Sequence, residues 1–222
     1  MARPPTLPVF QDLSIKGPEG ELASLRRDLL RHVAAPWSHA QKHEAELARH
    51  AGEGNVIVFE RCGDAQIAAA SLVLWSRADG YEITNIVPIE RDELSPGDYN
   101  LVLNDFAARI ATPAAAAAGF RVQMTGPDQS LEDWLSSAAA AAALRRFSAA
   151  ANKSTGSSHP MDRSRWFAFL ILAHSAERKP DTDQLARWLT EVERWPEERA
   201  HTLVIEYEFS LALLLEYDRA RP

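Results

Sequence analysis

Three strand-like runs near the middle of the chain constrain its fold more than any other feature. The runs are rich in apolar and β-branched residues and cover Asn55–Arg61, Gln66–Ser76 and Tyr81–Pro88. Gly63-Asp64 separates the first two runs, and Asp79-Gly80 separates the last two. Because an Asp-Gly pair between apolar runs is a strong hairpin signal, the three runs predict an antiparallel meander. An all-helical fold is therefore excluded.

Helices and two more strands are predicted around this meander. Alternating residues indicate strands at Val9–Lys16 and Phe120–Thr125. Apolar residues at helical spacing indicate four helices, at Glu21–Ala34, Trp37–Ala51, Tyr99–Ala118 and from Ser130 to about Ala151. Pro113 is expected to kink the third of these helices. Ser130 and Asp133 resemble a capping box at the start of the fourth.

The character of the chain changes after residue 151. A polar loop, Asn152–Pro160, is followed by three predicted helices at Met161–Ala176, Thr182–Trp195 and Pro196–Ala220. We therefore predict an α+β fold, in which a mostly antiparallel sheet with flanking helices forms a domain at residues 1–150. A three-helix C-terminal segment at residues 151–222 is expected to follow it and to pack on it or stand apart.

Charge and cysteine content exclude several classes of protein. The 24 Lys and Arg against 31 Asp and Glu give a net charge of −7, which argues against general nucleic-acid binding. The single cysteine, Cys62, excludes an intrachain disulfide and a four-cysteine zinc site. No apolar run approaches the roughly 20 residues that cross a bilayer, and prolines interrupt the N-terminus where a signal peptide is apolar. These features predict a cytoplasmic protein that does not insert into membranes.

The polar loop at residues 152–160 and the helix after it hold the strongest candidate binding site. Hydroxyls, free helix-start amides and cations together are what a phosphate or carboxylate requires. The predicted ligand-binding residues are Lys153, Ser154, Thr155, His159, Arg163 and Arg165. The alternative is a flexible connecting loop in which Ser158 or His159 caps the next helix. The glycine spacing of a P-loop is missing.

No metal site, cofactor or catalytic constellation is predicted. His39, His43 and His50 fall on one face if Trp37–Ala51 is a regular helix, but the Glu of a His-Glu-x-x-His metalloprotease signature is absent. Glu198 and His201 match a single Glu-x-x-His unit, of which a di-iron bundle needs two. The sequence therefore favours a protein that is not an enzyme, without settling the question.

The predicted order of elements over residues 9–150 resembles the core of the GNAT-type N-acetyltransferase fold. In that family a Val-Pro-like strand end leads into a glycine-rich turn that holds the pyrophosphate of acyl-CoA. Val87-Pro88 is present here, but the Gln/Arg-x-x-Gly-x-Gly/Ala pattern is absent. The loop that follows carries negative charge that repels a polyanion, at Glu90, Asp92, Glu93 and Asp98. The resemblance implies an acyl-CoA-dependent N-acyltransferase with an atypical loop at Arg91–Asn100.

The favoured function is a cytoplasmic binding or regulatory protein, which acts on a small anionic ligand or a protein partner at the 152–165 junction. The acyltransferase is the alternative. A third hypothesis is a homo-oligomer built through the acidic last helix, whose apolar side chains would be shared with a second copy. Those side chains are Leu203, Val204, Tyr207, Leu211, Leu214 and Leu215.

Overall fold

The computed structural model describes residues 5–52 and 54–221. Contacts within the chain divide it into two units. We call Pro8–Pro127 the sheet unit, and Met1–Leu7 together with Asp128–Pro222 the helical unit. Helices and antiparallel strands occur together, so the predicted α+β fold class is confirmed. No helix in the described part of the chain is both long and apolar enough to cross a membrane.

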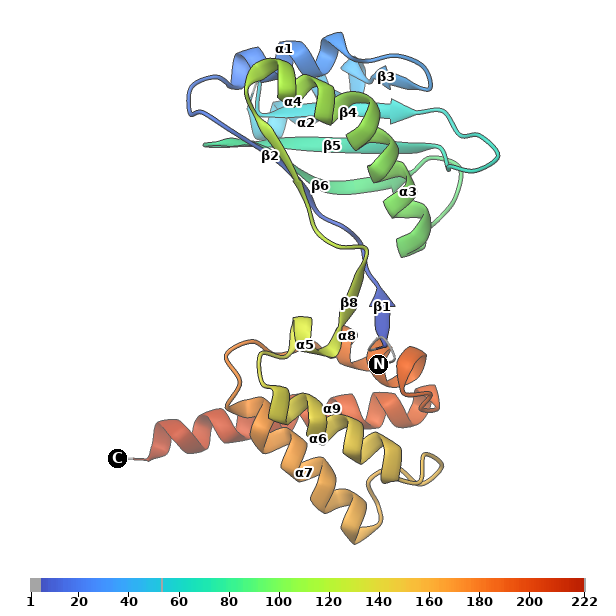
Figure 1. Ribbon diagram of the computed structural model, residues 1–222, viewed down its shortest axis with the longest axis vertical. Helices are drawn as coiled ribbons and strands as arrows, with labels where there is room; N and C mark the ends of the chain where they lie inside the picture. The colour runs from blue at the N-terminus through green and yellow to red at the C-terminus, as the bar shows by residue number, and fades with distance from the viewer. Residues whose placement is uncertain (1–4, 53, 222) are drawn as a thin grey trace. The chain divides into compact units, whose positions relative to one another are not determined.

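The sheet unit is built on one antiparallel sheet, whose strand order among the described residues is β3-β4-β5-β6-β2-β7 (Figure 1). In chain order the strands are β2 (Leu13–Lys16), β3 (Trp37–His39), β4 (Val56–Arg61), β5 (Ala70–Arg77), β6 (Gly80–Pro88) and β7 (Arg121–Met124). Each neighbouring pair in this order is antiparallel. The predicted meander is β4-β5-β6, and it lies at the centre of the sheet.

Helices cover both faces of this sheet because β4 alternates two apolar sets. The helices are α1 (Leu22–Arg31), α2 (Gln41–Ala51), α3 (Pro96–Phe106), the π-helical turn η1 (Ala107–Ala111) and α4 (Thr112–Ala118). Ile57 and Phe59 belong to the main core with α1, α3 and α4. Val56 and Val58 face the other way, where Leu47 of α2 packs against them. Full burial of one such side chain contributes about 2 kcal/mol.

The hairpin between β5 and β6 depends on a glycine. Gly80 lies where the backbone of β2 crosses closest to the turn. A Cβ atom built on Gly80 would lie 1.7 Å from the carbonyl oxygen of Ile15, which no side chain can tolerate. The Asp79-Gly80 pair therefore serves two purposes, since it forms the turn and lets β2 pair with β6.

The predicted helix at Trp37–Ala51 is wrong in its first turn. Trp37–His39 forms β3, which pairs with β4 through Trp37 opposite Arg61, and α2 begins only at Gln41. The tryptophan and the alanines after it fit a helical stripe equally well, so local spacing could not distinguish the two. The pairing with β4 decides the outcome, and it joins residues more than 20 positions apart.

The helical unit begins with a two-stranded sheet, in which β1 (Thr6–Pro8) pairs with β8 (Asp128–Ser130). Its helices are α5 (Leu131–Trp134), α6 (Ala138–Ala150), α7 (Pro160–His174), α8 (Thr182–Arg187), the π-helical turn η2 (Trp188–Val192) and α9 (Glu197–Ala220). The capping box of Ser130 and Asp133 is present. It starts only the short α5, and a separate cap at Ser137 starts α6.

Aromatic side chains form the core of the helical unit. Phe147 of α6 stacks on Trp195 with ring centroids 5.2 Å apart. Trp166 of α7 lies 5.0 Å from Phe147, and Phe169 stacks on Tyr207 of α9. These contacts join three helices, and aromatic pairs of this kind each contribute about 1 kcal/mol beyond the area they bury.

The division of the chain differs from the predicted boundary at residue 150. Residues 128–150 group with the C-terminal helices, because α6 packs along α7 and contributes Phe147 to their shared core. The polar loop at 152–160 is thus a connection within one unit. The chain passes from one unit to the other twice, between residues 7 and 8 and between residues 127 and 128.

Candidate functional site

Most hydroxyl groups of the 152–160 loop close turns on the loop itself, whereas Ser157 Oγ donates to Glu206 of α9 at 3.3 Å. Asn152 Oδ1 accepts hydrogen bonds from the backbone N–H of Ser154 at 3.0 Å and from its hydroxyl at 2.7 Å. Ser158 Oγ donates to the carbonyl of Thr155 at 2.9 Å. Side chains of this type commonly stabilise turns in this way. Two of the predicted ligand-binding residues, Ser154 and Thr155, therefore take part in loop structure.

The cations predicted for this site are spread over different contacts. Lys153 Nζ donates to the carbonyl of Glu193 and lies 5.9 Å from the ring centroid of Trp195. Arg165 Nη1 donates to the buried carboxylate of Asp162 at 2.6 Å. Arg163 is exposed on α7. The structure thus holds two of the three cations against protein groups.

Part of the predicted anion site does come together. Thr155, His159 and Arg165 line a hollow of about 670 Å³ at the start of α7, whereas Lys153, Ser154 and Arg163 are not among its lining residues. His159 caps the helix, since its Nδ1 accepts from the backbone N–H of Met161 at 3.3 Å. Asp162 also lines the hollow and brings a carboxylate beside Arg165. An anion would have to compete with that carboxylate for the guanidinium.

A second polar cluster surrounds the start of α2 in the sheet unit. His39 Nε2 lies 2.7 Å from the carboxylate of Glu44. The same carboxylate accepts a hydrogen bond from Arg26 of α1. The backbone N–H of Val58 donates to the same carboxylate at 3.3 Å. Burial of Glu44 raises its pKa, but the hydrogen bonds from His39 and Arg26 outweigh burial and leave the pKa below its ordinary value of 4.5. Glu44 is therefore ionised at neutral pH and joins three elements.

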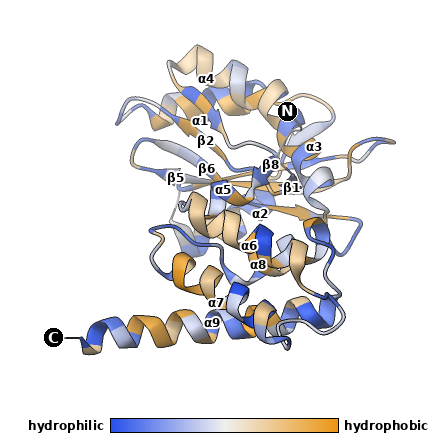
Figure 2. Cartoon of the chain, turned by 60° about the horizontal axis from the view of Figure 1, so that its bottom comes forward, coloured by the Kyte–Doolittle hydropathy of each residue, from blue (hydrophilic) through white to orange (hydrophobic). Residues whose placement is uncertain are grey.

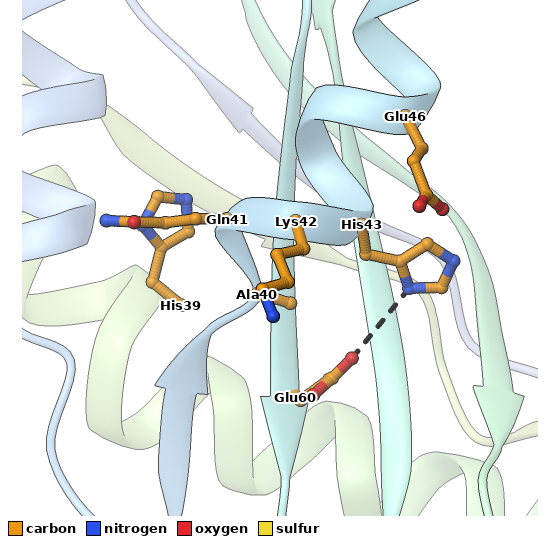
Figure 3. A pocket seen from close by; sticks show the side chains of 7 residues that line it. All are labelled: His39, Ala40, Gln41, Lys42, His43, Glu46 and Glu60. Atoms are coloured by element: carbon orange, nitrogen blue, oxygen red, sulfur yellow. Dashed lines mark ion pairs between the residues drawn. The ribbon is translucent and has the colours of Figure 1, made fainter.

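A hollow of about 480 Å³ lies beside this cluster (Figure 3). His43 of α2 and Glu60 of β4 point toward each other there, with His43 Nδ1 3.8 Å from the carboxylate. The His39 ring lies away from His43, so the predicted shared face of these histidines is wrong. The cause is the strand at Trp37–His39, which places His39 outside the helix. Charged and polar side chains make up most of the lining, whereas ligand pockets are usually mostly apolar.

The described residues contain no group of three or more His, Cys, Asp or Glu side chains that could hold a metal ion. Cys62, the single cysteine of the sequence, is exposed.

The most deeply buried charge in the sheet unit belongs to Arg61, which sequence reasoning did not single out. Its side chain is 2% exposed. Nε donates to Asp105 at 3.0 Å and Nη2 donates to Asp64 at 2.6 Å, while Nη1 donates to the carbonyls of Cys62 and Ile67. Trp37 Nε1 also donates to Asp105, at 2.8 Å. Because its donors are engaged in this way, Arg61 fixes the end of β4 and is not poised to bind a ligand.

In the loop at Arg91–Asn100, where the acyltransferase resemblance would place a pyrophosphate, the side chains bond to one another and to the start of α3. Ser95 Oγ accepts from the backbone N–H of Asp98 at 3.1 Å and caps α3. The Asp98 carboxylate accepts from Ser95 Oγ at 3.0 Å and lies 3.5 Å from Arg91. The start of α3 thus already carries a capping hydroxyl and a carboxylate where a pyrophosphate would have to bind.

The second half of α9 presents apolar side chains to solvent. Ala200, Leu203, Val204 and Tyr207 are buried in the first half, but no described residue from 208 to 220 is buried. We call the exposed stripe of residues at intervals of four the outward face of α9, and it comprises Ile205, Phe209, Leu213 and Tyr217. Phe209 is 68% exposed and Leu213 is 56% exposed. Figure 2 shows apolar colouring along α9 into its last turns, which extend past α7.

Part of the surface predicted for a homo-oligomer is therefore used inside the unit. Leu203, Val204 and Tyr207 are buried, and the Tyr207 hydroxyl donates to the carbonyl of Pro180 at 2.8 Å. Leu211 and Leu214 are half-buried, and Leu215 is exposed. The sequence signal for the outward face was present but missed: the apolar residues of α9 fall on more than one side of the helix, which is more than a single buried stripe needs.

Comparisons of the chain with protein-family models, with curated proteins and with solved structures find no match.

Proposed function

We propose that this chain is a binding protein that works through contact with another protein, and that the partner seats on the outward face of α9. The exposure of Phe209 and Leu213 on a well-formed helix is the observation that carries this proposal. Proteins that act alone rarely expose a contiguous apolar patch, and such patches commonly mark interaction sites. Covering one large apolar side chain contributes about 2 kcal/mol.

A neighbouring helix also exposes apolar side chains. Phe167 and Ile171 of α7 are exposed and lie on the same face of that helix as His174. His174 Nε2 is 2.7 Å from the Asp218 carboxylate of α9. At 100° per residue, Asp218 lies about 140° around α9 from Leu213, so this hydrogen bond is on the inner side of α9, and Phe167 and Ile171 form a separate exposed apolar pair.

Photo-cross-linking tests the proposal. A benzophenone amino acid in place of Leu213 is expected to give cross-linked adducts in the cells that make the protein. The same group in place of Thr202 serves as control, because Thr202 is exposed on the same side of α9, three turns earlier. We expect adducts at 213 that disappear when Phe209 is changed to Glu. Equal labelling at both positions, or none, would overturn the proposal.

A small anion at the 152–165 junction is a second candidate, supported by the meeting of Thr155, His159 and Arg165 in one hollow. Phosphate should then raise the melting temperature, and Arg165→Met should remove that shift. Arg163→Met is the matched control, because Arg163 lies on the same helix outside the hollow. A shift that both variants retain counts against the site.

The cytoplasmic location and the acyl-CoA-dependent alternative stay predictions. Calorimetry with CoA and acetyl-CoA tests the second, and binding heat that Ser95→Ala or Arg91→Ala alters would favour it over partner binding. The acidic residues around Asp98 lead us to rank it lower.

A further inference from the structure

We infer that the outward face of α9 binds a second copy of this chain, with the two α9 helices antiparallel and centred close to Leu213. The inference rests on the proposed function and names its partner. A symmetric pair buries the same patch on both copies, so the patch must be complementary to itself. The apolar stripe meets this requirement, since Phe209 and Tyr217 lie at equal distances on either side of Leu213.

The charges beside the stripe are arranged with opposite signs around the same centre. Glu208 lies five residues before Leu213 and Arg219 lies six residues after it. Glu206 and Arg221 lie seven residues before and eight residues after it. In an antiparallel pair each acidic side chain therefore comes level with a basic side chain of the second copy.

Helical geometry also places one of these charge pairs on the correct side. At 100° per residue, Glu208 and Arg219 fall on one side of the stripe, whereas Glu206 lies within it, about 20° from Leu213, and accepts a hydrogen bond from Ser157 Oγ at 3.3 Å. A two-fold axis perpendicular to the helices brings each side of the stripe against the same side in the second copy. Glu208 of each copy thus meets Arg219 of the other along one edge of the apolar contact.

A parallel pair lacks this complementarity. The two-fold axis then runs along the helices and brings opposite sides of the stripe together, so Glu206 would approach Glu208 of the second copy and Arg219 would approach its Arg221. Like charges across an interface disfavour that partner arrangement. Among residues 208–220, Glu216 is the one carboxylate within the stripe, and Arg219 of the same chain lies 2.5 Å from it. Because Arg219 offsets the charge of Glu216, the apolar contact does not have to cover an unpaired carboxylate.

The contact is modest in size. The half of α9 from residue 208 to 220 is about 20 Å long at 1.5 Å per residue. Small interfaces are typically weak and transient, so a high protein concentration is needed to populate the dimer. The dimer should therefore form at concentrations that light scattering can reach.

Light scattering coupled to size-exclusion chromatography tests the inference on the whole chain. We expect a dimer at about 100 µM that dissociates on dilution. Leu213→Glu should weaken the dimer by about a hundredfold or more, because each dimer loses two central apolar side chains. Thr202→Glu should leave it unchanged, since residue 202 would lie beyond the end of the second helix. Both positions are exposed, so circular dichroism should show unaltered folding.

A charge exchange tests the antiparallel arrangement. Glu208→Arg alone and Arg219→Glu alone should each weaken the dimer by about tenfold, because each creates two like-charge contacts per dimer. The double variant should restore it. Residues 208 and 219 are three turns apart in one chain, so they cannot repair each other within a single copy. The Arg219–Glu216 pair is lost in Arg219→Glu and in the double variant alike, so its loss cannot explain restoration of the dimer.

The outcomes separate this inference from the proposed function. A wild-type chain that stays monomeric at about 100 µM overturns the inference. Adducts at position 213 that have the mass of one chain plus a different protein also overturn it, but they support the proposed function. A monomer that binds lipid vesicles through α9 overturns both. A dimer that the double exchange fails to restore overturns the antiparallel pairing.

Discussion

At the scale of single residues, one buried cation organises the end of β4. Arg61 is almost fully buried, and its two carboxylate partners differ in exposure. Asp105 is 11% exposed, whereas Asp64 is 50% exposed. Burial raises the pKa of Asp105, but hydrogen bonds from Arg109, Arg61 and Trp37 outweigh it and lower the pKa. A buried ion pair is costly to break on one side, because the remaining charge is left in a poorly solvated place.

The difference between the two carboxylates predicts different costs of substitution. Asp105→Asn should lower the free energy of unfolding by about 3 kcal/mol, since it removes the buried counter-charge of Arg61. Asp64→Asn should lower it much less, since that carboxylate is solvated. Urea denaturation measures both. Equal costs for the two variants would show that burial of the partner does not decide the energy.

At the scale of elements, Glu44 holds α2 in place. Its carboxylate receives hydrogen bonds from Arg26 of α1 and from the backbone of β4, and it contacts His39 at the end of β3. These are charge-assisted contacts, which are stronger than neutral hydrogen bonds. Because α2 buries only a small apolar set against the sheet, these polar contacts carry much of its attachment.

The lowered pKa of Glu44 predicts how this attachment responds to acid. A carboxyl group whose folded-state pKa lies below its unfolded value of 4.5 stabilises the protein above that pH. That contribution is lost as the pH falls below 4.5 and through the folded-state pKa. Glu44→Gln should therefore cost about 1–2 kcal/mol at pH 7 and progressively less below pH 4.5.

The control for this prediction is Glu46→Gln, because Glu46 is exposed on the same helix. Urea denaturation between pH 3 and pH 7 should show a shallower acid loss for Glu44→Gln than for wild type or for the control. Three parallel pH profiles would contradict the role of Glu44.

Sequence patterns that span a few residues predicted the helices and strands well, but they could not predict which residues pair when those residues lie far apart in the chain. The meander was predictable because β-branched residues and Asp79-Gly80 are local signals. The capping box at Ser130 was also local, but the end of α5 at Trp134 was not predicted. The Glu44 cluster draws Arg26, His39 and Val58 from three separate elements, so no spacing in the sequence connects them.

At the scale of the whole molecule, the sheet unit is closed by its own ends. The backbone N–H of Val9 donates to the carbonyl of Pro127 at 2.9 Å, and Thr125 donates to Asp12 at 3.1 Å. The main core of this unit is drawn from residues between these ends. A segment whose ends lie together and whose core is its own has the properties of an independent domain.

The excised segment 8–127 is therefore expected to fold alone, with the cooperative unfolding transition that small domains show. Segment 1–150 ends at the boundary that the loop chemistry suggests, and it is the matched comparison. It carries α6 without α7, so Leu144 and Phe147 would lose their packing partners and remain exposed. We expect segment 1–150 to aggregate, or to gain no stability over 8–127, in urea denaturation followed by circular dichroism. A stable, soluble 1–150 beside an unfolded 8–127 would instead place the boundary at residue 150 and assign α6 to the sheet.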